Sequence, residues 1–370
     1  EIRFCDWSSD VCSSDLLDVD SIVAESMLAK SIGCESVIVD DGWQTIDNKR
    51  GYKYTGDWKP ERIADMKTFV NRIHSIGMKF ILWYSVPFVG EKSKAAKKFE
   101  GKFLHYNKHY GAFVFDPRYP DVRKYLIQKY LDALKDWGLD GFKLDFVDEF
   151  REYKENERYV PDNYKVLSKQ MDYSNVNEAT DRLLTDVIKS LTTTNPDILI
   201  EFRQNYVGPL MRKYGNMFRA GDCPYSVLQN RISTTNIRLL AGSTATHSDM
   251  LMWHPEETTE TAALQLLNVM FSVPQISVKM QTFPIAHFKM LRFWLAWWNK
   301  NRVALLDGNF EAHFPDLNYP LLIGKSENKL IAGVYSPQIL IPIQIDTSKV
   351  EQVSIINGSG GNEITINFEQ

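Results

Sequence analysis

Residues 139–150 read LDGFKLDFVDEF, and this stretch indicates how the chain folds. A helical pattern over about 120–137 ends at Gly138, and an apolar strand follows at once. Lys143 and Asp145 stand two residues apart in that strand, so their side chains point to the same side. Two opposite charges in an apolar strand form either a structural ion pair or part of an active site.

The same order of helix and strand repeats along most of the chain. Amphipathic helices are predicted over about 18–33, 62–77, 120–137, 177–193, 227–240, 258–272 and 283–300. The apolar strands between them read SVIVDDGW, MKFILWYSV, DGFKLDFV, DILIEFRQ, NMFRAGD, STATHSD and PQISVK. Continuous apolar strands separated by helices are typical of parallel βαβ units. These seven strands predict an α/β fold, a (β/α)8 TIM barrel that lacks its first strand.

The first sixteen residues, EIRFCDWSSDVCSSDL, show no clear period. Residues 6–16 match the translation of a common sequencing-library adapter, so we interpret residues 1–16 as a cloning or assembly artefact. We expect the natural N-terminus and the first barrel strand to be lost or replaced there, and the sequence assigns no compartment. Without this segment two cysteines remain, Cys34 and Cys223, which form no disulfide framework.

The pattern changes after residue 308. Short strands follow one another there as PLLIGKSE, KLIAGVYS, ILIPIQI and QVSIING, and NGSGG reads as a turn. This spacing predicts a small antiparallel β domain. We therefore divide the chain into the artefact at 1–16, a catalytic barrel at 17–307 and a C-terminal antiparallel β domain at 308–370.

Composition argues against several partners. A net charge of −4 over 370 residues gives no reason to expect a nucleic acid, and no apolar run reaches the roughly 18 residues that span a membrane. No Cys/His cluster suggests a metal, and we expect no cofactor. The aromatic fraction of 12%, with nine tryptophans, suits stacking on sugars but also suits a large core.

In barrels of this kind the chemistry takes place at the C-terminal ends of the strands. In this chain those ends carry Asp40, Asp41, Trp83, Lys143, Asp145, Glu201, Arg203, Asp222, His247 and Asp249. Each residue alone also has a structural explanation: a turn, a buried ion pair or a core histidine. Together they favour an active site, because burying so many ionisable groups is unfavourable unless they are paired or functional.

Carboxylates combined with aromatic residues suit the hydrolysis of glycosides. One carboxylate attacks the anomeric carbon and a second protonates the leaving oxygen. Asp145 and Asp222 are the plausible pair, because their strands are near neighbours across the barrel mouth. Lys143 is expected to hold Asp145 ionised, whereas Asp222 must stay protonated at rest and needs a drier setting. The residues expected to wall the sugar site are Trp43, Trp58 and Trp83.

Several motifs, taken in order, resemble those of one known family. VDDGW, TGDW, GMKFILW, GFKLDF and GD, with FDPRYPDVRKYL and THSDMLMWHP, are similar to the motifs of glycoside hydrolase family 36, the melibiase-type α-galactosidases. The similarity runs from about 18 to about 310. It implies a retaining, exo-acting enzyme that cleaves terminal α-galactosides of oligosaccharides, with Asp145 as nucleophile and Asp222 as acid/base. It also implies that Asp40 and Asp41 bind sugar hydroxyls, and that Trp83 and Lys143 line the subsite of the cleaved sugar.

One departure from the family bears on the substrate. EFRQNYVGP stands where the family tends to show a Cys-Ser-Gly-Gly-Gly-Arg-like loop, and we hypothesise that Arg203 and Gln204 replace its polar contacts. An α-glycosidase of other sugar specificity and a transglycosylase of raffinose-synthase type therefore stay open. More distant alternatives are a metal-dependent barrel lyase and a non-catalytic sugar-binding barrel.

Overall fold

The computed structural model describes residues 2–5, 18–47, 51–337, 350–361 and 363–364. Eight parallel strands close into a barrel in the order β1-β11-β10-β9-β8-β7-β3-β2. Their bounds are β1 Ile2–Cys5, β2 Cys34–Val39, β3 Lys79–Ser85, β7 Gly141–Asp145, β8 Leu199–Arg203, β9 Met217–Arg219, β10 Ala245–Leu251 and β11 Val273–Ile276. The predicted (β/α)8 barrel is confirmed, and each of the seven strands read from the sequence contributes to it.

The structure corrects the expectation of a missing first strand. Strand β1 pairs in parallel with both β2 and β11, through Arg3 with Ser36 on one side and with Gln275 on the other. It therefore closes the barrel from within the segment that the sequence set aside. Residues 6–16 lie outside the described residues, so their interpretation as an artefact stays a prediction.

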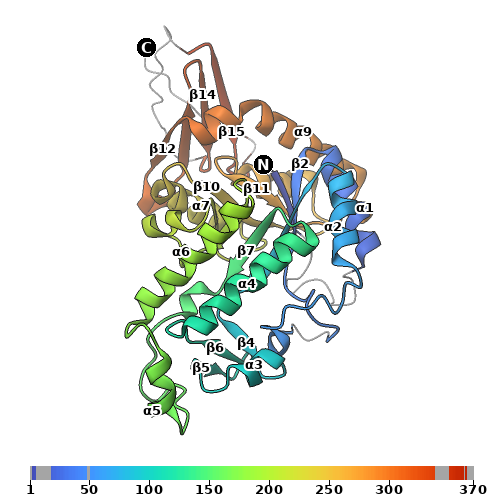
Figure 1. The fold of residues 1–370 in the computed structure, drawn as a ribbon. Coiled ribbons are helices and arrows are strands. Elements are labelled where there is room, and N and C mark those ends of the chain that lie inside the picture. The colour runs from blue at the N-terminus through green and yellow to red at the C-terminus, as the bar shows by residue number, and fades with distance from the viewer. Residues whose placement is uncertain (1, 6–17, 48–50, 338–349, 362, 365–370) are drawn as a thin grey trace.

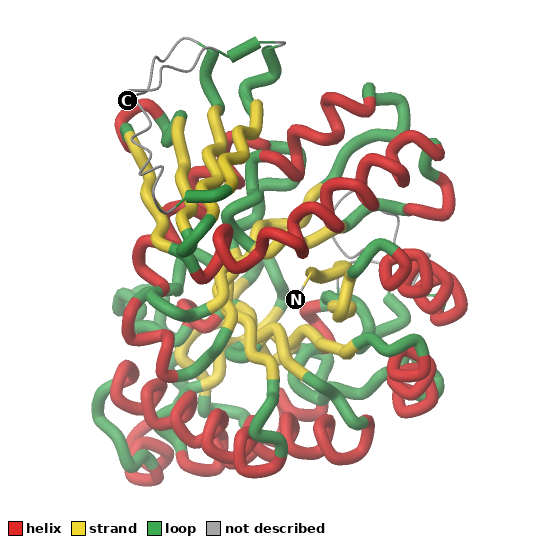
Figure 2. Tube along the Cα trace, turned by 90° about the horizontal axis from the view of Figure 1, so that it is seen from above, coloured by secondary structure: helices red, strands yellow, loops and turns green. Residues whose placement is uncertain are grey.

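Helices surround the barrel (Figures 1 and 2), and their ends follow local sequence signals. Helix α4, for example, begins with Pro120 at its first position and ends at Gly138, whose φ of 76° suits glycine. The other long helices also match the predicted ranges to within a few residues, apart from a shorter α8. The outer helices are α1 Val19–Ser31, α2 Met66–Ser75, α4 Pro120–Trp137, α6 Val176–Thr194, α7 Val227–Ala241, α8 Thr259–Leu267 and α9 Ile285–Arg302.

Two smaller sheets accompany the barrel. An antiparallel sheet of β4 Phe88–Gly90, β5 Phe103–Asn107 and β6 Ala112–Phe115 lies between β3 and α4 in the chain and was not predicted. The C-terminal sheet contains β12 Asn309–His313, β13 Leu321–Lys325, β14 Lys329–Val334 and β15 Gln352–Asn357. Strand β12 was not predicted. Strands β13 and β14 are antiparallel as predicted, but β15 joins β14 in parallel. The predicted strand ILIPIQI falls in 338–349, outside the described residues.

The core of the barrel has two parts, which the alternation of strand residues separates. In β2, Val37 and Val39 join the large cluster that also contains helix residues such as Leu126 of α4. Ile38 points the other way and joins a small cluster with Ile81 from the neighbouring strand. None of the helices in the described part of the chain has the length and apolar character needed to cross a membrane.

Candidate active site

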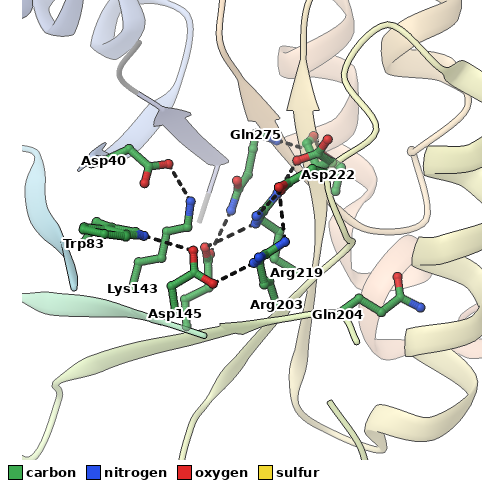
Figure 3. Close-up of polar contacts among 12 residues, drawn as sticks. Asp40, Trp83, Lys143, Asp145, Arg203, Gln204, Arg219, Asp222 and Gln275 are labelled. Carbon is green, nitrogen blue, oxygen red and sulfur yellow. Dashed lines mark hydrogen bonds and ion pairs between the residues drawn. The ribbon is translucent and has the colours of Figure 1, made fainter. Parts of the chain in front are cut away.

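Polar side chains on or just after the barrel strands meet at one end of the barrel (Figure 3). This is the carboxyl end of the strands, where β2, β3, β7, β8 and β9 finish close together. The residues that meet there include Asp40, Trp83, Lys143, Asp145, Glu201, Arg203, Arg219, Asp222, Asp249 and Gln275.

Asp145 ends strand β7 and is 6% exposed. Its Oδ1 accepts hydrogen bonds from Arg203 Nε at 2.7 Å, from the Tyr206 hydroxyl at 2.9 Å and from the backbone N–H of Phe146 at 2.8 Å. Its Oδ2 accepts one from the Trp83 indole at 3.0 Å. Four donors therefore fix the carboxylate, and Oδ2 carries fewer of them than Oδ1.

These contacts favour the charged form of Asp145. Burial opposes the charge, but the cations of Arg203 and Lys143 and the hydrogen bonds from Arg203 and Trp83 outweigh burial and lower the pKa of Asp145. Burial and the nearby Asp145 carboxylate raise the pKa of Tyr206, so its hydroxyl keeps its proton and donates. Arg203 and Tyr206 are thus close partners of Asp145, and Tyr206 was not identified from the sequence.

Lys143 has a different direct partner from the one expected. Its Nζ lies 2.5 Å from Oδ2 of Asp40, and both side chains are buried. Burial opposes the charge of Lys143, but the carboxylates of Asp40, Asp145 and Glu201 together outweigh it and raise the pKa of Lys143. The cation still contributes to lowering the pKa of Asp145, although Arg203 contributes more. Lys143 therefore acts on Asp145 at longer range, while it holds Asp40 in place.

Asp222 does not have the dry setting that was expected for a resting acid. Its side chain is 57% exposed and lies between two arginines. Arg219 Nη2 is 2.8 Å from Oδ1, and Arg203 Nη1 is 3.1 Å from Oδ2. Partial burial would raise the pKa of Asp222, but Arg219, Arg203 and Lys143 outweigh it and hold this pKa well below its usual range. The expectation that Asp222 is protonated at rest is therefore wrong.

Arg219 is the central cation that sequence reasoning missed. It is 1% exposed at the end of β9, and it contacts Asp222, Asp249 and, at 3.8 Å, Glu201. Gln275 of β11 donates to Glu201 at 2.8 Å. Glu201 and Asp249, two of the predicted strand-end residues, therefore hold Arg219 in place. The motif NMFRAGD places Arg219 three residues before Asp222, and this spacing could have indicated their contact.

The three tryptophans differ in position. Trp83 of β3 reaches the site through its indole, which donates to Asp145. Trp43 is fully buried, donates to the Trp83 carbonyl oxygen at 2.9 Å and packs at 5.8 Å against Trp137. Trp58 is 4% exposed and packs between Trp43 and Trp83. Trp43 and Trp58 therefore belong to the core behind Trp83, which corrects the expectation that they wall a sugar site.

An aromatic group that the sequence did not indicate lies near Asp41. The Tyr52 hydroxyl donates to Asp41 Oδ2 at 3.0 Å, and Asp41 is half-buried. The Tyr52 ring packs against Tyr110 at 4.8 Å and against Phe146, the residue after Asp145, at 5.7 Å. This cluster links the loop after β2 to the loop after β7.

Gln204 lies outside the polar cluster, and His247 is buried in strand β10. The Gln204 side chain accepts from the backbone N–H of Gly221 at 3.3 Å and points away from the carboxylates (Figure 3). It thus supports the loop that carries Asp222. His247 is buried within β10, and its backbone carbonyl accepts from the N–H of Ala220. In the part of the chain that the structure describes, no three His, Cys, Asp or Glu side chains are grouped to hold a metal ion.

Comparison with known families gives one match, to the Melibiase family model over residues 14–205. This range covers more than half of the chain and includes Asp40, Trp83, Lys143, Asp145 and Arg203. It ends before Asp222. The family resemblance that the motifs indicated is therefore confirmed.

Solved structures with the same fold include α-galactosidases of glycoside hydrolase family 36. AgaA from Geobacillus stearothermophilus in complex with stachyose gives a TM-score of 0.70 at 16% identity, over 88% of this chain and 45% of that one. An α-galactosidase from Lactobacillus brevis gives 0.69 at 16% identity, over 88% and 44%. An α-amylase from Geobacillus thermoleovorans with acarbose gives 0.61 at 13% identity, over 88% and 84%. The chain thus spans less than half the length of these α-galactosidases.

Proposed function

This chain belongs to the melibiase family, and from that premise we propose that it is a retaining α-glycosidase that releases terminal α-galactose from oligosaccharides. One observation carries the proposal: the Arg203 guanidinium contacts both Asp145 and Asp222. Two carboxylates that share one guanidinium are close enough to act on the same glycosidic bond. A retaining mechanism requires such a close pair.

Asp145 acts as the nucleophile in this proposal. Its charged form is favoured at neutral pH, and its four donors hold it in a single orientation. Oδ1 accepts three hydrogen bonds, whereas Oδ2 accepts one. Oδ2 therefore keeps a lone pair with which to attack the anomeric carbon. The bond to the leaving oxygen breaks as the bond to Oδ2 forms.

Asp222 acts as the acid and then as the base. Its exposed side chain is open to the leaving group and to water. It gives a proton to the leaving oxygen in the first step and takes one from water in the second, while that water displaces Asp145 from the anomeric carbon. Two displacements at this carbon return the α configuration.

The Asp40–Lys143 pair and Asp41 with Tyr52 are proposed to hold the hydroxyls of the terminal sugar. They sit beside Asp145 and present charged donors and acceptors, which suit the many hydroxyls of a sugar. AgaA, which shares the fold, has been crystallised with stachyose and with raffinose. This supports an α-galactoside of an oligosaccharide as substrate. Because Asp222 is exposed, a sugar acceptor in place of water is the second candidate outcome, and it makes the protein a transglycosylase.

A panel of aryl α-glycosides tests the proposal. We expect the α-galactoside to be cleaved fastest, and Asp145→Ala to lose this activity. Asp222→Ala should lose about 10²–10⁴-fold with a poor leaving group but much less with an activated phenol, which leaves without a proton. Azide should restore Asp145→Ala and give the β-glycosyl azide, because it attacks from the face that Asp145 vacates.

The controls separate the two roles. With Asp222→Ala, azide should instead attack the covalent intermediate and give the α-glycosyl azide. If either variant keeps the wild-type rate on substrates with poor leaving groups, the assigned roles are wrong. Activity on another α-glycoside with none on α-galactosides would overturn the galactosidase specificity but keep the mechanism. Transfer products formed with added sugar acceptors would identify a transglycosylase.

A further inference from the structure

We propose that Arg203 is a displaceable latch between the two carboxylates. Its guanidinium bridges Asp145 and Asp222, and an entering sugar breaks the contact with Asp222 while the contact with Asp145 persists. This inference rests on the proposed function, because it assumes that these two carboxylates carry out the reaction. It explains how Asp222 gains a proton only when a substrate is present.

The two arginines that hold Asp222 differ in how firmly they are fixed. The Arg219 side chain is 2% exposed and is held from behind by Asp249 and Glu201. The Arg203 side chain is 20% exposed and faces the mouth. Moving Arg219 would leave buried carboxylates without their cation, which is costly. Arg203 is therefore the arginine that can leave Asp222.

The two ends of Arg203 also differ. Nε lies 2.7 Å from a buried Asp145, and the guanidinium stacks over the Phe146 ring at 5.3 Å. Nη1 lies 3.1 Å from Asp222, whose side chain is 57% exposed. Water weakens an ion pair that has one exposed partner, so a hydrogen bond from Nη1 to a sugar hydroxyl can replace this contact. The guanidinium then stays beside the nucleophile and binds the substrate.

The latch alters the proton affinity of the pair. Asp222 faces Arg203 from β8, Arg219 from β9, Lys143 from β7 and the carboxylate of Asp249 from β10. Burial raises the pKa of Asp222, while the three cations lower it. Loss of the Arg203 contact removes one of the two cations in direct contact, so the pKa of Asp222 rises toward its usual value. In the substrate complex Asp222 can then take up a proton at a pH at which it stays ionised in the free enzyme.

The pH dependence of the kinetics tests the latch. The profile of kcat/KM reports the free enzyme, and that of kcat reports the enzyme–substrate complex. Because the two carboxylates titrate as a pair, each profile gives apparent pKa values for the pair. In the wild-type enzyme we expect the apparent pKa values from the kcat/KM profile to lie at least about one pH unit below those from the kcat profile. This difference corresponds to a tenfold change in proton affinity. In Arg203→Gln the apparent pKa values from kcat/KM should rise, and their difference from those of kcat should disappear.

Two variants serve as controls. Arg203→Lys keeps the charge, but a lysine cannot bridge two carboxylates as a planar fork, so an intermediate gap is expected. Arg182→Gln removes an exposed arginine of α6 that pairs with Asp186, and it should leave both profiles in place. A gap that persists in Arg203→Gln, or no gap in the wild-type enzyme, overturns the latch. Lack of turnover on any glycoside would instead overturn the proposed function.

Discussion

Trp83 and Trp43 have different roles, one in the proposed active site and the other in the core. The indole of Trp83 donates to the proposed nucleophile, whereas the indole of Trp43 donates to the backbone of Trp83. Both side chains are almost fully buried, so exposure alone does not separate them. Their hydrogen-bond partners do.

Replacing each tryptophan by phenylalanine should therefore affect activity differently. Trp83→Phe removes a donor to a carboxylate, which contributes about 1.5–3 kcal/mol. We expect kcat/KM to fall roughly 10- to 150-fold. The free energy of unfolding should fall as well, because a buried hydrogen bond and part of a buried ring are lost. Trp43→Phe should also lower that free energy, by about 1–3 kcal/mol, because it removes the buried hydrogen bond to the Trp83 carbonyl oxygen, but it should leave kcat/KM close to wild type.

Steady-state kinetics and urea unfolding followed by fluorescence measure both quantities on the same samples. Equal losses of activity in the two variants would contradict the division of roles. A Trp83→Phe enzyme with unchanged kcat/KM would show that its hydrogen bond to Asp145 does not matter to the reaction.

At this scale the sequence predicted which carboxylates meet but not what holds them. Asp145 and Asp222 follow from counting strands, because strand ends in a barrel share one face. The cations that pair with them depend on side-chain reach across neighbouring strands, which no spacing along the chain reveals. Arg219 contacts Asp249, thirty residues later, and Lys143 contacts Asp40, more than a hundred residues earlier. The sequence therefore predicted the electrostatic effect of Lys143 on Asp145 but missed its direct contact with Asp40.

Among the elements, strand β1 has the clearest effect on stability. It pairs with β2 and β11 and so closes the barrel next to the strand that precedes Asp40. A barrel has no exposed strand edges once it is closed. Removing β1 would expose the edges of both neighbours and loosen the loop that carries Asp40 and Asp41.

A chain that starts at Asp18 should therefore be less stable than the full chain and more prone to aggregation. Arg3→Pro, a milder change, should also lower the melting temperature, because proline cannot donate to the ladder in the middle of a sheet. Thermal unfolding of the three chains compares them. If the truncated chain and Arg3→Pro both unfold at the same temperature as the full chain, β1 plays no part in the barrel.

The elements also show why some predictions held and others did not. Long amphipathic helices such as α4 and α6 have a clear period and clear ends, and they were found to within a few residues. Strands β4, β5 and β6 are short and form a sheet of their own, so they carry no helix–strand alternation to reveal them. The parallel pairing of β15 with β14 is a matter of topology, and sequence spacing alone favoured an antiparallel partner.

Across the whole molecule, one core joins the barrel to the C-terminal sheet. Leu322, Ile331 and Tyr335 belong to the same apolar cluster as the outer face of the barrel. Arg231 of α7 stacks over the Tyr335 ring at 4.4 Å and donates to the Asn318 carbonyl oxygen. These contacts fix the sheet beside β10 and β11, away from Asp145. We infer that the sheet supports the barrel, while the strand ends form the site.

The central claim is that the barrel brings Asp145 and Asp222 together as a nucleophile and an acid/base for double displacement. The configuration of the first product tests this claim most directly, because it depends on the number of displacements and not on the rate. Proton NMR during hydrolysis of an aryl α-galactoside distinguishes the two anomers of galactose before they equilibrate. We expect the α anomer to form first, and a first-formed β anomer would overturn the double displacement.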